Sequence, residues 1–130
     1  MKYWIMALPR DAMLHCIKIG TFGRSQKHVL PSVEAGDKIA CYVTGEKKII
    51  ALGEATEPYF YDESKIFASG NSAYPHRIRF QANRLNEEID LVQYLDRLSF
   101  ITNLAYWSVY FRLGFKEISQ ADWKLITRTA

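Results

Sequence analysis

The sequence predicts one mixed α+β domain, residues 1–130, with a strongly curved, barrel-like sheet of about five to six strands and three or four short peripheral helices. Three observations carry this prediction. A β-hairpin occupies the middle of the chain, its strands are apolar on both sides, and short helical segments alternate with strand-like runs. Strands buried on both faces are typical of sheets that wrap around a core. A chain of 130 residues, 48% hydrophobic, supplies one such core.

The first part of the chain predicts a strand followed by a helix. Residues 2–8 form a short apolar run that a proline ends. A helical segment with apolar residues at helical spacing begins at Pro9, and Gly20 is placed to end it. Residues 20–28, GTFGRSQKH, have two glycines and no periodicity, so we expect a loop there, followed by one helical turn at residues 30–33.

The stretch over residues 33–58 organises the rest of the chain. Residues 39–43 alternate between two apolar faces, and residues 49–52 form a second apolar strand. The connection over residues 44–47 contains Gly45, which accepts a positive φ without a Cβ penalty. This pattern predicts a hairpin whose two strands are both central to the sheet.

A further strand follows a long polar connection over residues 62–72 and begins at Tyr74-Pro75. Because side chains alternate across a strand, one side is core and the other is cationic. The core side carries Ile78, Phe80 and Ala82, and the opposite side carries Arg77, Arg79 and Gln81.

Two more helices are expected towards the C-terminal end. Residues 87–98 carry a helical apolar stripe with acidic residues near its start, which predicts a surface helix. Residues 119–122 have the spacing of a capping box, with Asp in place of the preferred Glu, before a short closing helix. Residues 100–115 between them are rich in β-branched and aromatic side chains.

The totals favour a soluble cytoplasmic protein without a membrane partner. No apolar run approaches the ~20 residues of a membrane span, and the first residues reach a proline and charges too soon for a signal peptide. Cys16 and Cys41 lack metal-ligand or CxxC spacing, so they are interpreted as small buried side chains in a reducing compartment. We expect no metal site, no disulfide and no cofactor.

The distribution of charge is more informative than the net charge of +3. Residues 12–33, 64–86 and 97–116 contain no Asp or Glu. If these stretches converge in space, they form one basic face of the kind that attracts a phosphate backbone. They hold ten of the seventeen Lys and Arg residues: Lys18, Arg24, Lys27, Lys65, Arg77, Arg79, Arg84, Arg97, Arg112 and Lys116.

No catalytic constellation stands out. The three histidines are scattered, and the chain has neither a GxSxG-type nucleophile nor a glycine-rich phosphate loop. Asp11 and His15 are four residues apart on the predicted helix, but no nucleophile is placed beside them, so they are interpreted as an ordinary surface pair. The sequence therefore favours a binding module over an enzyme.

Two aromatic residues lie where a core does not obviously need them. Phe22 stands between two glycines in a basic stretch, and Trp107 has Ser108 beside it. Flat nucleobases stack on such rings with a gain of about 1–3 kcal/mol each, and neighbouring polar groups read the base edge. Packing of these rings into the core is the alternative interpretation, and it is the stronger one for Trp4 and Trp123.

An ordered set of short motifs over nearly the whole chain resembles the EVE domain in its compact single-domain form. The resemblance implies a PUA-like pseudo-barrel, related to the YTH and ASCH domains. It also implies binding of a modified base, taken out of its stack, in an aromatic-lined pocket. The motifs are Tyr3-Trp4-Ile5, Phe22-Gly23 with Lys27-His28, Val33-x-x-Gly36-Asp37-Lys38 with Tyr42-Val43, Glu57-Pro58-Tyr59, Tyr74-Pro75 and Trp107-Ser108.

The resemblance assigns residues to that pocket by position. Phe22 stands where relatives commonly have Trp, which keeps a stacking surface but removes an indole N–H donor. Trp107-Ser108 match a late Trp-Ser pair of the family, and no catalytic residue carries over. The predicted base pocket is Phe22, Gly23, Lys27, His28, Trp107 and Ser108, and the predicted phosphate contacts are Arg24, Arg77 and Arg79.

The function predicted from these observations is a non-catalytic reader of modified DNA or RNA. Members of the family occur near restriction and RNA-modification systems, whose proteins are the expected protein partners. Two alternatives remain open: a small-molecule or nucleotide binder or enzyme that uses the same pocket, and a protein-interaction module. The first predicts affinity for free nucleotides with little salt dependence, and the second predicts a complex that survives nuclease treatment.

Overall fold

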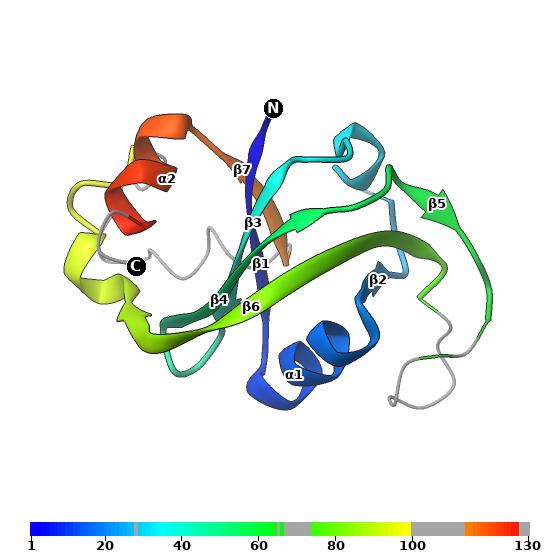
Figure 1. Cartoon of the computed structure of the whole chain (residues 1–130), viewed down its shortest axis with the longest axis horizontal. Coiled ribbons are helices and arrows are strands. Elements are labelled where there is room, and N and C mark those ends of the chain that lie inside the picture. Colours follow the sequence, from blue (N-terminus) through cyan, green and yellow to red (C-terminus); the bar gives the residue numbers. More distant parts are fainter. Residues whose placement is uncertain (28, 65, 67–73, 100–113, 128–130) are drawn as a thin grey trace.

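The computed structural model describes residues 1–27, 29–64, 66, 74–99 and 114–127, and its sheet is curled into a half-barrel (Figure 1). The predicted fold class is confirmed, although the described residues hold two α-helices and two 3₁₀ turns, so the expected number of helices is slightly too high. The elements are β1 (Tyr3–Leu8), α1 (Arg10–Ile19), β2 (Thr21–Arg24), η1 (Leu30–Ser32), β3 (Lys38–Val43), β4 (Lys48–Ala55), β5 (Phe60–Tyr61), β6 (His76–Asp90), η2 (Leu91–Tyr94), β7 (Phe115–Ile118) and α2 (Gln120–Thr127).

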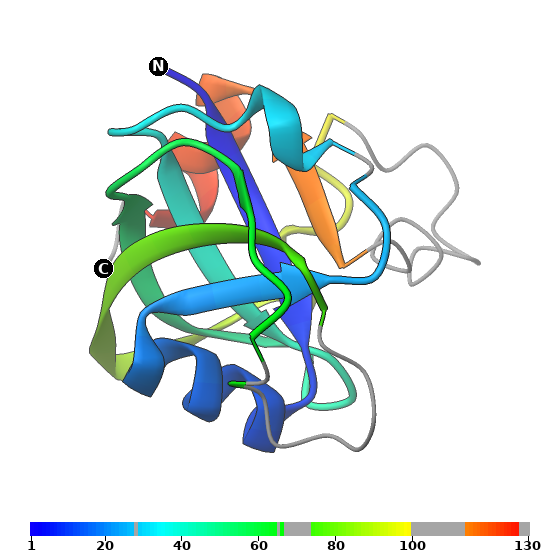
Figure 2. The same cartoon turned by 90° about the vertical axis from the view of Figure 1, so that its right-hand side faces the viewer.

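Among the described residues, the sheet has seven strands in the order β2-β6-β4-β3-β1-β7, with β5 paired to β6 off this path. β1 and β3 are parallel, and the other pairs are antiparallel. The long strand β6 pairs with β4 along one part and with β2 and β5 near its start, so it crosses the molecule and bends around it (Figures 1 and 2). β2 and β7 are therefore the two ends of the curl.

Apolar side chains fill both faces of the central strands. On β3, Ile39, Cys41 and Val43 join the cluster beneath α1, whereas Ala40 and Tyr42 join the cluster beside η2 and α2. All five are buried, which confirms the alternation predicted for the hairpin. Because a strand sends successive side chains to opposite faces, one apolar run supplies two cores.

The helices begin and end where their sequence signals predict. Gly20 adopts φ 68° after α1, a left-handed conformation that carries no Cβ penalty in glycine. Before α2, the Ser119 hydroxyl accepts a hydrogen bond of 3.1 Å from the backbone N–H of Asp122. Within the described ranges, neither helix reaches the length and apolar character that a membrane crossing requires.

Two expectations about local structure are wrong. Residues 21–24 are strand β2 and not loop, because they pair with residues 76–79 of β6. Residues 87–90 continue β6 and only residues 91–94 form a 3₁₀ turn, so the expected surface helix is absent there. In both cases, pairing with a distant strand outweighs the local pattern. Residues 100–113 lie outside the described residues.

Candidate functional site

The seam between the two end strands, β2 and β7, is closed by side chains. The rings of Phe22 on β2 and Phe115 on β7 are stacked, with centroids 5.3 Å apart and planes 29° apart. Trp4 on β1 contacts the same Phe115 ring at 5.1 Å. Figure 2 shows the start of β7 beside the chain that leaves β2. The seam, defined here by β2 and the start of β7, thus has an aromatic floor.

Phe22 belongs to this floor and does not offer a free ring. Its exposed fraction is 1%, so a base has no open face of the ring to stack on in this structure. The prediction that Phe22 is a loop residue with an accessible ring is therefore wrong. The physical reason is its place in β2, where pairing with Ile78 directs both side chains into the core.

Arg24 lies in the same seam, beside Gly114. It stands two residues after Phe22 and so points to the same side of β2, and it pairs in register with His76. Its guanidinium lies beside Gly114, where a Cβ would be 3.7 Å from Nη1. Nη1 is buried and has no hydrogen-bond partner within the described part of the chain. Burial lowers the pKa of Arg24.

Tyr59 and His76 form a polar and aromatic pair at the start of β6. The Tyr59 hydroxyl lies 2.5 Å from Nδ1 of His76, and the two rings are stacked 5.8 Å apart. Tyr61, which is 55% exposed, meets the His76 ring edge-on at 5.2 Å. Because His76 pairs with Arg24 across the two strands, the rings of Tyr59, Tyr61 and His76 lie near Arg24.

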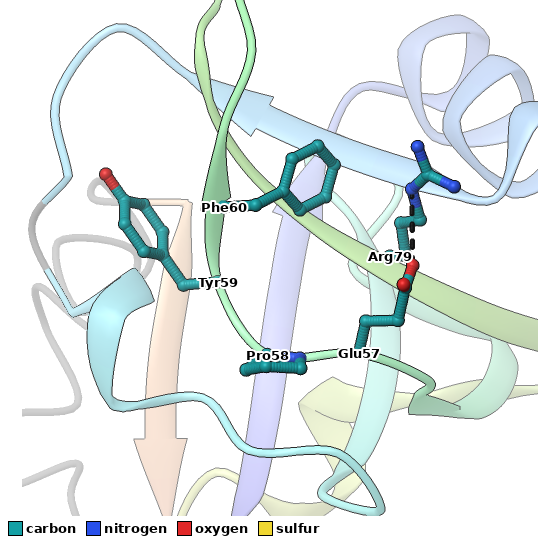
Figure 3. Close-up of a pocket in the computed structure, with 5 residues that line it drawn as sticks. All are labelled: Glu57, Pro58, Tyr59, Phe60 and Arg79. Atoms are coloured by element: carbon teal, nitrogen blue, oxygen red, sulfur yellow. Dashed lines mark ion pairs between the residues drawn. The ribbon is translucent and has the colours of Figure 1, made fainter.

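A shallow pocket of about 280 Å³ lies on the outer surface, where the chain passes from β4 to β5. It is lined by Glu57, Pro58, Tyr59, Phe60 and Arg79 (Figure 3). The Arg79 guanidinium lies 5.1 Å from the centroid of the Phe60 ring, and its Nε is 3.4 Å from Oε2 of Glu57. Both charged side chains are 56% exposed, so this cation is open to an approaching anion.

Arg77 does not face solvent, and its expected role as a phosphate contact is contradicted. Its side chain is 1% exposed, although it points away from Ile78 and the core beneath α1. The guanidinium donates to the hydroxyl and carbonyl oxygens of Ser64 and to the carbonyl of Tyr74, and pairs with Asp62 at 3.7 Å. Arg77 therefore ties both ends of the connection before β6 to the sheet.

The remaining predicted site residues are only partly described. Gly23 lies in β2 opposite Arg77, and Lys27 is exposed beyond the end of β2. His28, Trp107 and Ser108 lie outside the described residues. Pairing of β2 with β6 joins two of the acid-free stretches, as the basic-face prediction requires. The guanidinium of Arg77 is nevertheless buried, in contact with residues of the connection before β6.

Sequence reasoning did not identify the aromatic side chains in and next to β5 as site residues. Tyr59, Phe60 and Tyr61 form an aromatic run that was visible before the structure. Their alternation predicts that Phe60 faces one way and its neighbours the other. Only the pairing of β5 with β6 shows that these faces meet Arg79 and His76.

Known proteins share this fold. Human THYN1, solved in complex with DNA containing 5-methylcytosine, has a TM-score of 0.69 at 12% identity, with 99% of this chain and 97% of that chain covered. The YTH domain of Zygosaccharomyces rouxii MRB1, solved in complex with N6-methyladenosine RNA, has a TM-score of 0.69 at 10% identity, with 98% and 85% covered. Likeness at such identity establishes the fold.

Similarity in sequence establishes the family. The chain is 30% identical over 143 residues to UPF0310 protein PH1033 of Pyrococcus horikoshii, with 98% of each chain covered. The EVE domain family model matches residues 2–129. This chain belongs to the EVE domain family.

Proposed function

We propose that this protein is a non-catalytic module that binds nucleic acid and recognises a modified base. The observation that carries the proposal is its likeness, over nearly the whole chain, to two proteins solved in complex with methylated DNA or methylated RNA. Those two ligands differ in base and in sugar, but each carries a methyl group on a base. The shared feature supports a modified base as the ligand of this EVE domain.

The geometry of the described residues supports the same proposal. Arg24 lies in register with His76, whose ring stacks on Tyr59, and Arg79 lies beside Phe60 in the pocket on the outer surface. Cations contact phosphates, and aromatic rings accept bases by stacking. Phosphate contacts supply most of the affinity in such an arrangement, so binding weakens steeply with added salt.

Discrimination for the modification is assigned to Trp107 and Ser108, on the resemblance of their motif to the family's late Trp-Ser pair. A ring that stacks on the base and a hydroxyl that reads its edge make up a selective pocket. Burial of a methyl group adds about 0.8 kcal/mol, which biases the choice of base without dictating it. Lys27 and His28 supply the basic end of the same pocket.

Trp107→Ala is expected to weaken binding of a modified oligonucleotide by about 1–3 kcal/mol and to leave binding of the unmodified one nearly unchanged, because stacking carries the discrimination. Fluorescence anisotropy with paired oligonucleotides measures both affinities. The pairs are 5-methylcytosine DNA and N6-methyladenosine RNA, each against its unmodified counterpart. Circular dichroism checks the fold of the variant. An equal loss for both members of a pair by a folded variant contradicts the pocket assignment.

Arg79 and Glu57 make a charge pair whose two members have opposite expected effects on binding. Arg79→Gln removes a phosphate contact, so it weakens binding and lowers the salt dependence by about one charge. Glu57→Gln releases Arg79 from its carboxylate, so it strengthens binding by about two- to fivefold. Anisotropy titrations at several salt concentrations measure both effects.

Arg97 and Asp96 supply a matched control for this pair. Arg97 lies 3.9 Å from Asp96 and 5.0 Å from the centroid of the Tyr94 ring, so its surroundings resemble those of Arg79. The segment after β6 lies at the opposite end of the domain from β5 (Figure 1). Arg97→Gln and Asp96→Asn should leave affinity and salt dependence unchanged. Equal effects from both pairs would point to net charge alone and count against a site at β5.

A further inference from the structure

Arg24 is an unusual arginine for the surface of a small domain. Its Nη1 is buried and lacks a hydrogen-bond partner. Among the described residues, no other buried side-chain nitrogen or oxygen atom lacks one. A guanidinium stays protonated in proteins, so the group is a charge with an unused donor. Most buried polar atoms in native structures are satisfied, and an exception calls for a physical reason.

The described surroundings of Arg24 offer no counter-charge. Arg24 takes part in none of the ion pairs between described residues. The stretch that contains it, residues 12–33, has no Asp or Glu. The seam beneath it is lined by the rings of Phe22 and Phe115, and the guanidinium lies against the bare backbone of Gly114. A charge held against apolar groups without an anion costs stability.

Gly114 is a neighbour of the guanidinium. A Cβ at this position would lie 3.7 Å from Nη1 and 3.9 Å from Cζ of Arg24, in van der Waals contact with the group. The glycine therefore places no side chain of its own against the buried guanidinium nitrogen. The Nη1 donor is therefore buried in the seam, unlike the donor of a flexible surface arginine, which lies in water.

We infer that Arg24 is the phosphate-binding residue of the seam, and that its guanidinium donates to a single backbone phosphate beside the recognised nucleotide. The inference rests on the proposed function and names one contact of that function. An anionic oxygen fits better than a neutral base carbonyl, because only an anion offsets the buried charge as well as accepting the hydrogen bond. Arg79 differs from Arg24, since its exposed charge already has a carboxylate partner.

The inference predicts opposite effects of Arg24→Met on stability and on binding. Methionine keeps an unbranched apolar stem but removes the unpaired charge, so the free protein should melt at the same temperature as wild type or higher. Affinity for an oligonucleotide should fall by about 10- to 100-fold, because a charge-assisted contact to phosphate is lost. Arg24→Lys keeps the charge without the planar fork and should restore affinity in part.

The contact is tested on the ligand as well as on the protein. Modified oligonucleotides are prepared in which one phosphate at a time is replaced by a neutral methylphosphonate. Wild type should lose affinity by about tenfold or more at one linkage next to the modified base, and Arg24→Met should lose nothing further at that linkage. Arg97→Gln, the control at the other end of the domain, should show the wild-type penalty.

Several outcomes would overturn the inference. They are a wild-type protein that tolerates every single methylphosphonate, an Arg24→Met variant that keeps the wild-type penalty, and an Arg24→Met variant that melts well below wild type. The methylphosphonate scan of the wild-type protein needs no variant, so a folding failure leaves the test intact. Failure of the proposed function is distinguishable, because wild type then binds none of the modified oligonucleotides more tightly than their unmodified counterparts.

Discussion

Gly53→Ala is expected to destabilise the protein by about 3 kcal/mol or more, because the added methyl group has no room. Gly53 on β4 pairs with Ala82 on β6, and a Cβ there would lie 2.0 Å from the carbonyl oxygen of Gln81 and 2.7 Å from Cα of Ala82. Both are backbone atoms, so the strands must separate to accept it. Urea denaturation followed by circular dichroism measures the free energy of unfolding.

Gly45→Ala is the control that distinguishes a steric clash of the added methyl group from the cost of a positive φ in alanine. Gly45 has φ 84° in the β3–β4 turn, and a Cβ there would meet nothing within 4 Å. The expected cost is therefore only the left-handed conformation of alanine, about 1 kcal/mol. If Gly53→Ala costs no more than Gly45→Ala, the close approach of β4 and β6 at Gly53 is refuted.

Asp37→Ala is expected to cost about 3 kcal/mol at neutral pH, since it removes an acceptor of three hydrogen bonds. The carboxylate is 1% exposed. It accepts from the backbone N–H of Lys2 at 2.9 Å, from the backbone N–H of Glu34 at 2.9 Å and from the indole N–H of Trp4 at 3.0 Å. One side chain thus joins the start of β1 to the turn before β3. Denaturant unfolding measures the loss.

The same carboxylate gives a pH dependence with a defined sign. Burial raises the pKa of Asp37, but hydrogen bonds from Glu34, Lys2 and Trp4 together with the Lys2 charge hold it below the ordinary value of 3.8. The stabilisation is therefore fully present above pH 3.8 and is lost as the pH falls through the lower pKa of the folded state.

Asp37→Asn is the control for this pH dependence, because its side chain has the same shape and does not titrate. The stability difference between wild type and Asp37→Asn should shrink as the solution is made more acidic than pH 3.8. A difference that stays constant over that range contradicts an ionised, hydrogen-bonded Asp37 in the folded protein.

The local elements with strong sequence signals were predictable. The first strand, the helix after Pro9, the turn at residues 30–33 and the central hairpin are all present, as is the closing helix after Ser119. Each depends on neighbours in sequence: an apolar period, a cap or a turn residue. The family could also be inferred from the ordered motifs, and it is confirmed over residues 2–129.

The types of residue in the candidate site could be predicted from the sequence, but their burial and contacts could not. Arg24 and Arg79 were identified as cations for phosphate, and the structure places one in the seam and the other on the outer surface. Arg77 has the same charge and lies on the same strand as Arg79, yet it is buried and donates hydrogen bonds to Ser64 and Tyr74. Alternation along a strand indicates which way a side chain points, but not what covers it.

The sequence by itself determined the fold class, the family and the positions of most turns and caps, because those depend on short-range patterns of apolar, glycine and capping residues. Only the tertiary structure decided that residues 21–24 form a strand, that Phe22 packs on Phe115 and that Arg24 is left with an unused donor. These features arise where β2, β6 and β7 meet. Contacts between segments so far apart in the chain leave no periodic trace in any one of them.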